Sequence, residues 1–273
     1  MNGLIWIIAA TLILPKQIIS PVKCAHGTLI IFSATKTSII IAADSGLAQN
    51  GKIVSPTQRK IMRVGRNAAC AVMGMVHLRF SGKAQANPVD IETTVRNWIA
   101  QHASSTLQEV HRGLTEELSG QFADVRVPYL DKDFGISFFC VGFDMGVPIG
   151  LRSTFSFQMG TPPKLDSDKL IFTPGLVIPV ARAKVATEIL WGDSAELNTF
   201  KSEAVIAKYR EARRSGGLAA LSEKDLLSIS SACLKATESF EASTFDHQAA
   251  EVSAPNLFAV IDKQTGFRWV KLP

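Results

Sequence analysis

The sequence predicts an α+β fold in a single domain, and three observations lead to this prediction. Short runs rich in β-branched residues occur near the start, in the centre and at the end of the chain, which indicates paired strands. Two regions with apolar residues at helical spacing separate these runs. The chain has 273 residues, of which 47% are hydrophobic, and this is enough for one sizeable core. Because strands and helices follow one another in blocks, the pattern favours the α+β class.

Four pairs of strands are expected. In each pair, two apolar runs are separated by a short turn of polar residues or glycine. The pairs are 28–34 with 38–43, 60–64 with 68–73, 136–143 with 148–157, and 256–262 with 267–272. Each pair should form a hairpin.

Apolar residues recur at intervals of three and four residues in four stretches, which predicts helices there. The stretches are 91–102, 107–118, 181–191 and the segment that follows residue 222. In the last of them, Ser222 and Asp225 have the spacing of a capping box. The polar, basic segment 192–221 is expected to be a surface connection, and a Pro-rich loop at 161–163 is expected to end the central strands.

The charge balance gives no sign of a nucleic-acid partner. The chain has 29 Lys and Arg against 24 Asp and Glu. Lys16 and Lys23 lie in the leader described below, so residues 28–273 carry 27 basic residues against 24 acidic ones, a net charge of +3. This mild excess forms no dense basic patch interleaved with aromatic residues. We therefore expect no nucleic-acid binding.

The cysteines and histidines show no metal-binding pattern. No CxxC or HxxxH occurs in the sequence, and we expect neither a metal nor an organic cofactor. Cys70, Cys140 and Cys233 lie in apolar, periodic surroundings and are expected in the core. If Cys24 is removed with the leader, three cysteines remain, an odd number that argues against a fully paired disulfide framework.

The first residues have the pattern of an export signal. Residues 4–14 are an uninterrupted apolar run of 11, too short to span a bilayer comfortably but typical of a signal-peptide core. We expect residues 1–27 to be a signal peptide and propeptide, and residues 28–273 to form the domain. The protein should then be secreted or periplasmic, with no membrane association beyond the export signal. The alternative is a hydrophobic first strand or a membrane-tethered leader.

Four residues near the start of the predicted domain have a chemically informative spacing. Thr28 follows Gly27, and Asp44, Lys60 and Gly74 come 16, 32 and 46 residues after Thr28. A threonine that becomes N-terminal can supply the nucleophile and, through its own α-amine, the base. A lysine held by an aspartate supplies a local positive charge. This combination indicates amide hydrolysis.

The spacing resembles the active site of β-type proteasome subunits, the threonine members of the N-terminal-nucleophile hydrolases. The resemblance is strongest over residues 25–76, where the matching segments are 25–28, 39–45, 51–52, 55–56, 59–60 and 73–74. Beyond residue 76 it consists of the order of elements and a similar closing strand at 255–262. It implies a four-layer α-β-β-α sandwich, with the nucleophile at the start of the first strand. It also implies a peptide or protein substrate and assembly into a homo-oligomer.

The resemblance gives each residue a role. Oγ of Thr28 would attack the carbonyl carbon while the free α-amine accepts the proton, so the Gly27–Thr28 bond must be cleaved first. Lys60 would place a positive charge beside the amine and the hydroxyl, which favours their deprotonated forms. Asp44 would keep Lys60 ionised and oriented. The backbone N–H of Gly74 would face the developing oxyanion.

Some positions depart from the family pattern. Leu29-Ile30 stands where the family commonly has threonines, and Gly46 where it commonly has an arginine. No Gly-Ser-Gly turn occurs, so the residues that would support the terminal amine stay unassigned; Ser156, Asp246 and Ser253 are the nearest candidates. The expected function is a threonine-type peptidase. The alternatives are a non-proteolytic N-terminal-nucleophile amidase and a catalytically inactive proteasome-like structural subunit.

Overall fold

The structure, a computed structural model, has the α+β class that the sequence predicts. Within the part of the chain that it describes, antiparallel sheets combine with six α-helices and two short 3-10 helices. The described residues are 24–26, 29–49, 52–55, 60–74, 77–78, 89–102, 106–123, 125, 134–158, 160–180, 184–244 and 256–272.

The first sheet contains the first and last hairpins of the chain. Its strand order is β13-β2-β3-β14-β15, and all neighbours are antiparallel. Oγ1 of Thr35 closes the turn between β2 and β3, because it accepts hydrogen bonds from the N–H groups of Thr37 (3.1 Å) and Ser38 (2.9 Å). Both predicted hairpins are confirmed. The strands are β2 (Ile30–Ala34), β3 (Ser38–Ala43), β13 (Val177–Val180), β14 (Leu257–Asp262) and β15 (Gly266–Val270).

The second sheet contains the other two predicted hairpins, both of which are confirmed. Its order is β12-β11-β10-β7-β6, again antiparallel throughout. Met145 (φ 46°) and Gly146 (φ 82°) are both left-handed, so β10 and β11 join through a tight two-residue turn. The strands are β6 (Ile61–Val64), β7 (Ala68–Gly74), β10 (Phe134–Asp144), β11 (Val147–Phe157) and β12 (Lys164–Ile171).

Two strands in these sheets were not expected. The central strands do not end at the loop 161–163, because β12 follows that loop directly. Most side chains of β12 are exposed at the edge of its sheet. An edge strand of this kind needs no apolar alternation, so residues 164–171 carry no strand pattern. β13 has only four residues and is recognised by its pairing with β2.

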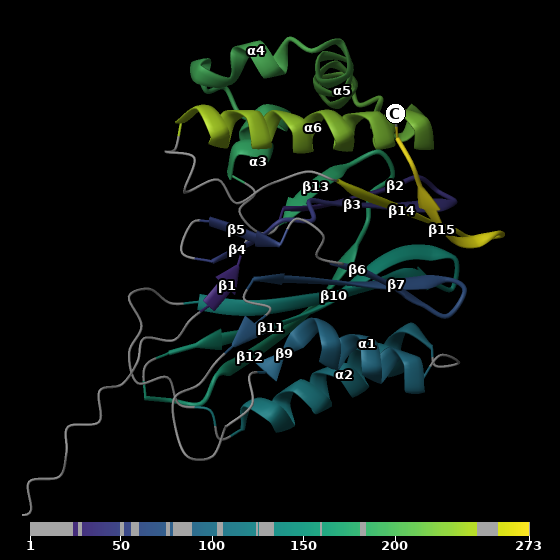
Figure 1. Ribbon diagram of the computed structural model, residues 1–273. Coiled ribbons are helices and arrows are strands. Elements are labelled where there is room, and N and C mark those ends of the chain that lie inside the picture. Colours follow the sequence, from purple (N-terminus) through teal and green to yellow (C-terminus); the bar gives the residue numbers. More distant parts are fainter. Residues whose placement is uncertain are drawn as a thin grey trace, which may run out of the picture.

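A third, smaller sheet has the order β5-β4-β1-β8-β9. β1 is its central strand and pairs antiparallel with both β4 and β8. Figure 1 shows β1, β4 and β5 together at one end of the two larger sheets. The strands are β1 (Cys24–His26), β4 (Leu47–Gln49), β5 (Lys52–Ser55), β8 (His77–Leu78) and β9 (Val89–Asp90).

Two predicted helices, α1 (Ile91–Gln101) and α2 (Leu107–Phe122), cover the outer face of the second sheet (Figure 1). Their apolar stripes share a buried cluster with residues of that sheet such as Phe138. Thr106 caps α2 with a capping box: its N–H donates to Oε2 of Glu109 at 2.7 Å, and the N–H of Glu109 donates to its Oγ1 at 3.3 Å.

The other two predicted helices, α3 (Lys184–Leu190) and α6 (Glu223–Thr244), cover the outer face of the first sheet (Figure 1). The predicted capping box at the start of α6 is present. The N–H of Asp225 donates to Oγ of Ser222 at 3.2 Å, and the N–H of Ser222 donates to Oδ2 of Asp225 at 3.0 Å. These bonds satisfy backbone donors that the first turn of a helix leaves open.

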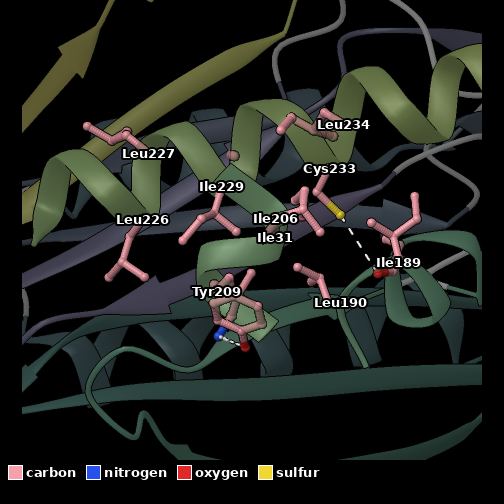
Figure 2. Packing of buried hydrophobic residues seen from close by; sticks show 14 of the residues in the cluster. Ile31, Ile189, Leu190, Ile206, Tyr209, Leu226, Leu227, Ile229, Cys233 and Leu234 are labelled. Carbon is pink, nitrogen blue, oxygen red and sulfur yellow. Dashed lines mark hydrogen bonds between the residues drawn. The ribbon is translucent and has the colours of Figure 1, made fainter. Parts of the chain in front are cut away.

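The expectation of a surface connection at 192–221 is wrong. Ile206 and Tyr209 of this segment are fully buried, and Figure 2 shows Tyr209 in the same cluster as Leu226 and Ile229 of α6. Oη of Tyr209 also accepts a hydrogen bond from the N–H of Val177 in β13 at 3.1 Å. A few apolar residues at helical spacing, within a polar segment, are therefore enough to fix it on the core. The helices here are η1 (Ala195–Leu197), α4 (Asn198–Lys201), α5 (Ala204–Arg214) and η2 (Leu218–Ala220).

A third cluster of buried side chains lies between the two large sheets. Phe32 of β2 and Phe139 of β10 meet there, with ring centroids 5.1 Å apart. Alternate residues of β2, such as Ile31, instead pack under α6 and its neighbouring helices. Burial of both faces explains why β2 and β3 are continuous apolar runs. No helix in the described part of the chain is long and apolar enough to cross a membrane.

Candidate active site

The centre of the candidate site is a buried ion pair between Asp44 and Lys60. Asp44 directly follows β3, and Lys60 directly precedes β6, so the pair links the two large sheets at their ends. Nζ of Lys60 donates to Oδ2 of Asp44 at 2.7 Å. The relative exposure is 0% for Asp44 and 2% for Lys60. The ion pair that the sequence predicts is therefore present, and it is shielded from solvent.

The carboxylate of Asp44 also holds two backbone N–H groups. Oδ1 accepts from the N–H of Leu29 at 2.7 Å, and Oδ2 accepts from the N–H of Gly46 at 3.1 Å. In return, the N–H of Asp44 donates to the carbonyl oxygen of Leu29 at 3.2 Å. The bond to Gly46 is an Asx turn, a local motif that directs the chain away from β3. Asp44 thereby fixes the backbone of the residue that follows Thr28.

Opposing effects act on the protonation of Asp44. Burial raises the pKa of its carboxyl group above the ordinary value. The ammonium group of Lys60 and the N–H groups of Leu29 and Gly46 lower that pKa and so limit the rise. Three donors directed at one carboxylate stabilise its ionised form. The pair as a whole then has no net charge, which is how buried charges are usually accommodated.

Gly74 is connected to this pair through β7. The carbonyl oxygen of Lys60 accepts a hydrogen bond from the N–H of Val72 at 3.1 Å. Gly74 lies two residues further along the same strand, where β7 ends, and it is opposite Ile136 of β10. The structure thus joins three of the four predicted site residues, Asp44, Lys60 and Gly74, through one ion pair and one stretch of backbone.

The fourth predicted residue, Thr28, lies outside the described residues, as do Gly27, Asp246 and Ser253. Both flanks of Gly27-Thr28 are described: β1 ends at His26, and Leu29 is bonded to Asp44. Thr28 directly precedes Leu29 in the sequence, and neighbouring Cα atoms are about 3.8 Å apart. The N–H of Leu29 is the backbone group that Asp44 holds. Ser156, which the sequence left unassigned, lies in β11 between Gly135 and Lys164 of the adjacent strands.

The segment before Gly27 pairs with strands on both sides. In β1, Ala25 is opposite Gln49 of β4 and also opposite His77 of β8. β4 follows Asp44 in the chain, and β8 follows Gly74. The two strands that leave the site therefore hold an extended chain between them. Backbone pairing on both sides is the geometry by which strand addition recognises an extended peptide.

Some of these features were not anticipated from the sequence. The bond from Leu29 to Asp44 and the pairing of β1 join residues whose contact has no local pattern. The Asx turn does have one, because Asp44 precedes Gly46 by two residues and Asp-x-Gly favours such a turn. Among the described residues, no group of three or more His, Cys, Asp or Glu is arranged to hold a metal ion.

No protein-family model matches the chain, and no curated protein gives a significant match to it.

Proposed function

We propose that this protein is a threonine-type peptidase whose nucleophile is Thr28, exposed by cleavage of the Gly27–Thr28 bond. One observation carries the proposal: the buried Asp44–Lys60 pair is hydrogen-bonded to the N–H of Leu29, the residue after Thr28. A buried lysine is costly unless its charge is used or compensated. Here the compensating carboxylate also fixes the chain next to the proposed nucleophile.

The proposed mechanism needs no cofactor. Oγ of Thr28 attacks the carbonyl carbon of the substrate, and the α-amine of Thr28 accepts the hydroxyl proton. The backbone N–H of Gly74 donates to the oxyanion of the tetrahedral intermediate. The leaving amine takes the proton and departs, which leaves an ester on Oγ. Water, activated by the α-amine, hydrolyses that ester. The charge of Lys60 favours the unprotonated amine that is needed before each attack.

The arrangement of layers supports a four-layer α-β-β-α sandwich of the N-terminal-nucleophile type. α1 and α2 pack on one large sheet, α3, α5 and α6 pack on the other, and a third cluster of buried residues lies between the sheets. In the proposed fold the nucleophile precedes the first long strand. Thr28 precedes β2 by two residues.

The pairing of β1 supports an extended peptide as the substrate. When residues up to Gly27 are removed, the backbone groups of β4 and β8 that β1 had paired with become free for another strand. A peptide bound there would be recognised by its backbone as well as by its side chains. This feature favours a peptidase over an amidase for small substrates.

We further propose that the protein is exported and acts as a homo-oligomer in a secreted or periplasmic location. The apolar run 4–14 is the support for export. A fusion to a reporter that is active only outside the cytoplasm should give signal, and deletion of residues 2–20 should abolish it. Equal signal from the deletion would contradict export. Light scattering on the mature protein would measure its oligomeric state.

Intact mass and active-site labelling test the proposed function. The mature protein should begin at Thr28, and an electrophilic peptide probe should label that residue. If the cleavage is autocatalytic, Thr28→Ala should keep the bond after Gly27 intact, and it should take up no probe. Thr37→Ala changes an exposed threonine of the β2–β3 turn and should behave as wild type. Active protein that retains Gly27 would refute the mechanism. A folded mature protein that neither turns over peptides nor reacts with the probe would favour the inactive structural subunit.

A further inference from the structure

Two cysteines lie directly opposite each other in the centre of the second sheet. Cys70 of β7 is the register partner of Cys140 of β10. Directly opposed residues in antiparallel strands have Cα atoms about 4.5–5.5 Å apart. A disulfide requires a Cα separation of about 4.4–6.8 Å. The backbone of this pair therefore has the spacing of a disulfide without any rearrangement.

The side chains meet as well. Both point to the face of the sheet that α1 and α2 cover, and both are fully buried in the same cluster. The two Sγ atoms are 2.7 Å apart. This is closer than two sulfur atoms lie in ordinary non-bonded contact. The third described cysteine, Cys233, is in a different cluster, under α6, where its Sγ contacts the carbonyl oxygen of Ala186 at 3.8 Å.

We propose that Cys70 and Cys140 form a cross-strand disulfide when the protein folds in an oxidising compartment. The oxidant is a disulfide donor, such as oxidised glutathione or a thiol oxidoreductase. The thiolate of one cysteine attacks a donor sulfur and releases one donor thiolate. The thiolate of the second cysteine then attacks the first cysteine's sulfur in this mixed disulfide and releases the other donor thiolate. Two cysteine thiols are oxidised, one donor disulfide is reduced, and the two protons pass to the donor thiolates.

The bond forms during folding and not afterwards. Burial raises the pKa of the Cys140 thiol well above its ordinary value, and the contact with Cys70 adds to this rise. A thiol in this state provides almost no thiolate, which is the species that reacts. A donor also has no access to it once α1 and α2 cover the sheet. Folded, reduced protein should consequently resist oxidation.

The disulfide would act on the strand that carries part of the candidate site. Cys70 is two residues before Val72, whose N–H donates to the carbonyl oxygen of Lys60, and four residues before Gly74. A covalent link between β7 and β10 would keep this strand in register. The inference itself depends only on the register and the contact, and not on any activity of the protein.

The test is a thiol count on the full chain after refolding from the reduced, unfolded state in a glutathione redox buffer. Alkylation in denaturant should modify two cysteines fewer than in a reduced sample, and peptide mapping should find one linked peptide pair containing Cys70 and Cys140. Equal counts in the two samples would refute the proposal. A linked pair containing Cys24 or Cys233 would also refute it.

Variants supply the matched control. Cys233→Ala removes a cysteine that is buried to the same extent; it should leave the linked pair, and the difference in urea midpoint between oxidised and reduced samples, as in wild type. Cys70→Ala should abolish both the linkage and the difference in midpoint between oxidised and reduced samples. If Cys70→Ala does not fold, the thiol count on wild type and on Cys233→Ala still decides the proposal.

Discussion

Nζ of Lys60 lies 2.7 Å from Oδ2 of Asp44, and the exposure of the two side chains is 1% and 0%. A pair this deeply buried loses most of its hydration, so its mutual attraction mainly offsets the cost of burying two charges. Removal of one partner is a different matter, because it leaves the other charge buried and uncompensated. The pair therefore affects the free energy of unfolding most when one of its partners is removed.

The first prediction concerns stability. Lys60→Met should lower the free energy of unfolding by about 3–5 kcal/mol at neutral pH, since Asp44 is left without its counter-charge. Urea denaturation measures the change. The control is Lys169→Met, which breaks the ion pair between Lys169 and Asp144. The Lys169 side chain is 49% exposed and the Asp144 side chain 29%. That change should cost less than about 1 kcal/mol. Equal losses in the two variants would contradict the burial argument.

This loss of stability should depend on pH. Without Lys60, the cation that lowers the pKa of Asp44 is missing, so burial raises that pKa further above the value in the unfolded chain. A carboxyl group with a raised pKa contributes stability that is full below its unfolded pKa and is lost as pH rises through its folded pKa. Lys60→Met should therefore be less destabilising at acidic pH than at neutral pH. A constant difference from wild type would contradict this.

The second prediction concerns activity. Lys60→Ala and Asp44→Asn should each lower peptide-amide hydrolysis by a factor on the order of 10²–10³. Lys60→Arg should lower hydrolysis as well, because a planar guanidinium does not reproduce a compact ammonium. None of these three changes should lower activity further when it is combined with Thr28→Ala, since the effects of residues that act as a unit are not additive. Lys169→Ala is the control and should keep full activity. Normal turnover by folded Lys60→Ala would remove the lysine from the mechanism.

The success of sequence reasoning here depends on how local each signal is. The hairpins of both large sheets, and the helices with the Thr106 and Ser222 caps, have local patterns of apolar spacing and turn residues. β12 lacks such a pattern because it is an exposed edge strand. The segment 192–221 resembles a surface connection in sequence because its buried residues, such as Ile206, are few among many polar ones. Secondary structure was thus largely predictable, except where tertiary contacts decide it.

The candidate site likewise combines features that the sequence predicts with features that only tertiary contacts determine. The spacing of Asp44 and Lys60 predicts their pairing, and the structure shows the contact between them. The bond from Leu29 to Asp44 and the position of β1 between β4 and β8 could not be inferred, because each joins segments distant in sequence. On one side of each contact stands a backbone group, the N–H of Leu29 or the chain of β1, and such a group leaves no trace in residue identity.

The third prediction concerns the slot between β4 and β8. A peptide with the sequence of residues 22–27 should inhibit the mature enzyme competitively, because it can restore the pairing of β1. Ala25→Pro in that peptide should weaken inhibition by about tenfold, since proline lacks the N–H and a lost hydrogen bond is worth about 1 kcal/mol or slightly more. Inhibition constants measure this. If the proline peptide inhibits as strongly as the peptide with the natural sequence, β1 does not mark a binding slot.

The fourth prediction concerns His111, which lies away from the candidate site in α2. Its Nε2 is 3.0 Å from Oγ of Ser153, and that hydroxyl is also 2.9 Å from both Oγ1 of Thr115 and Oγ of Ser167. Burial lowers the pKa of His111, and a backbone hydrogen bond with Arg152 and the charge of Asp168 partly oppose this effect. The guanidinium of Arg152 is itself paired with Asp168 at 2.6 Å. A neutral imidazole therefore suits this network.

The sign of the pH effect follows from that lowered pKa. A histidine whose folded pKa lies below its unfolded value contributes stability above the unfolded pKa, about 6.5, and loses it as pH falls through the folded pKa. The urea midpoint of wild type should thus fall between neutral pH and about pH 5, and His111→Gln should show a smaller fall. His102→Gln, at an exposed histidine stacked on Trp98, is the control. If His111→Gln and wild type lose stability in parallel over this range, His111 does not titrate as this partly buried hydroxyl network requires.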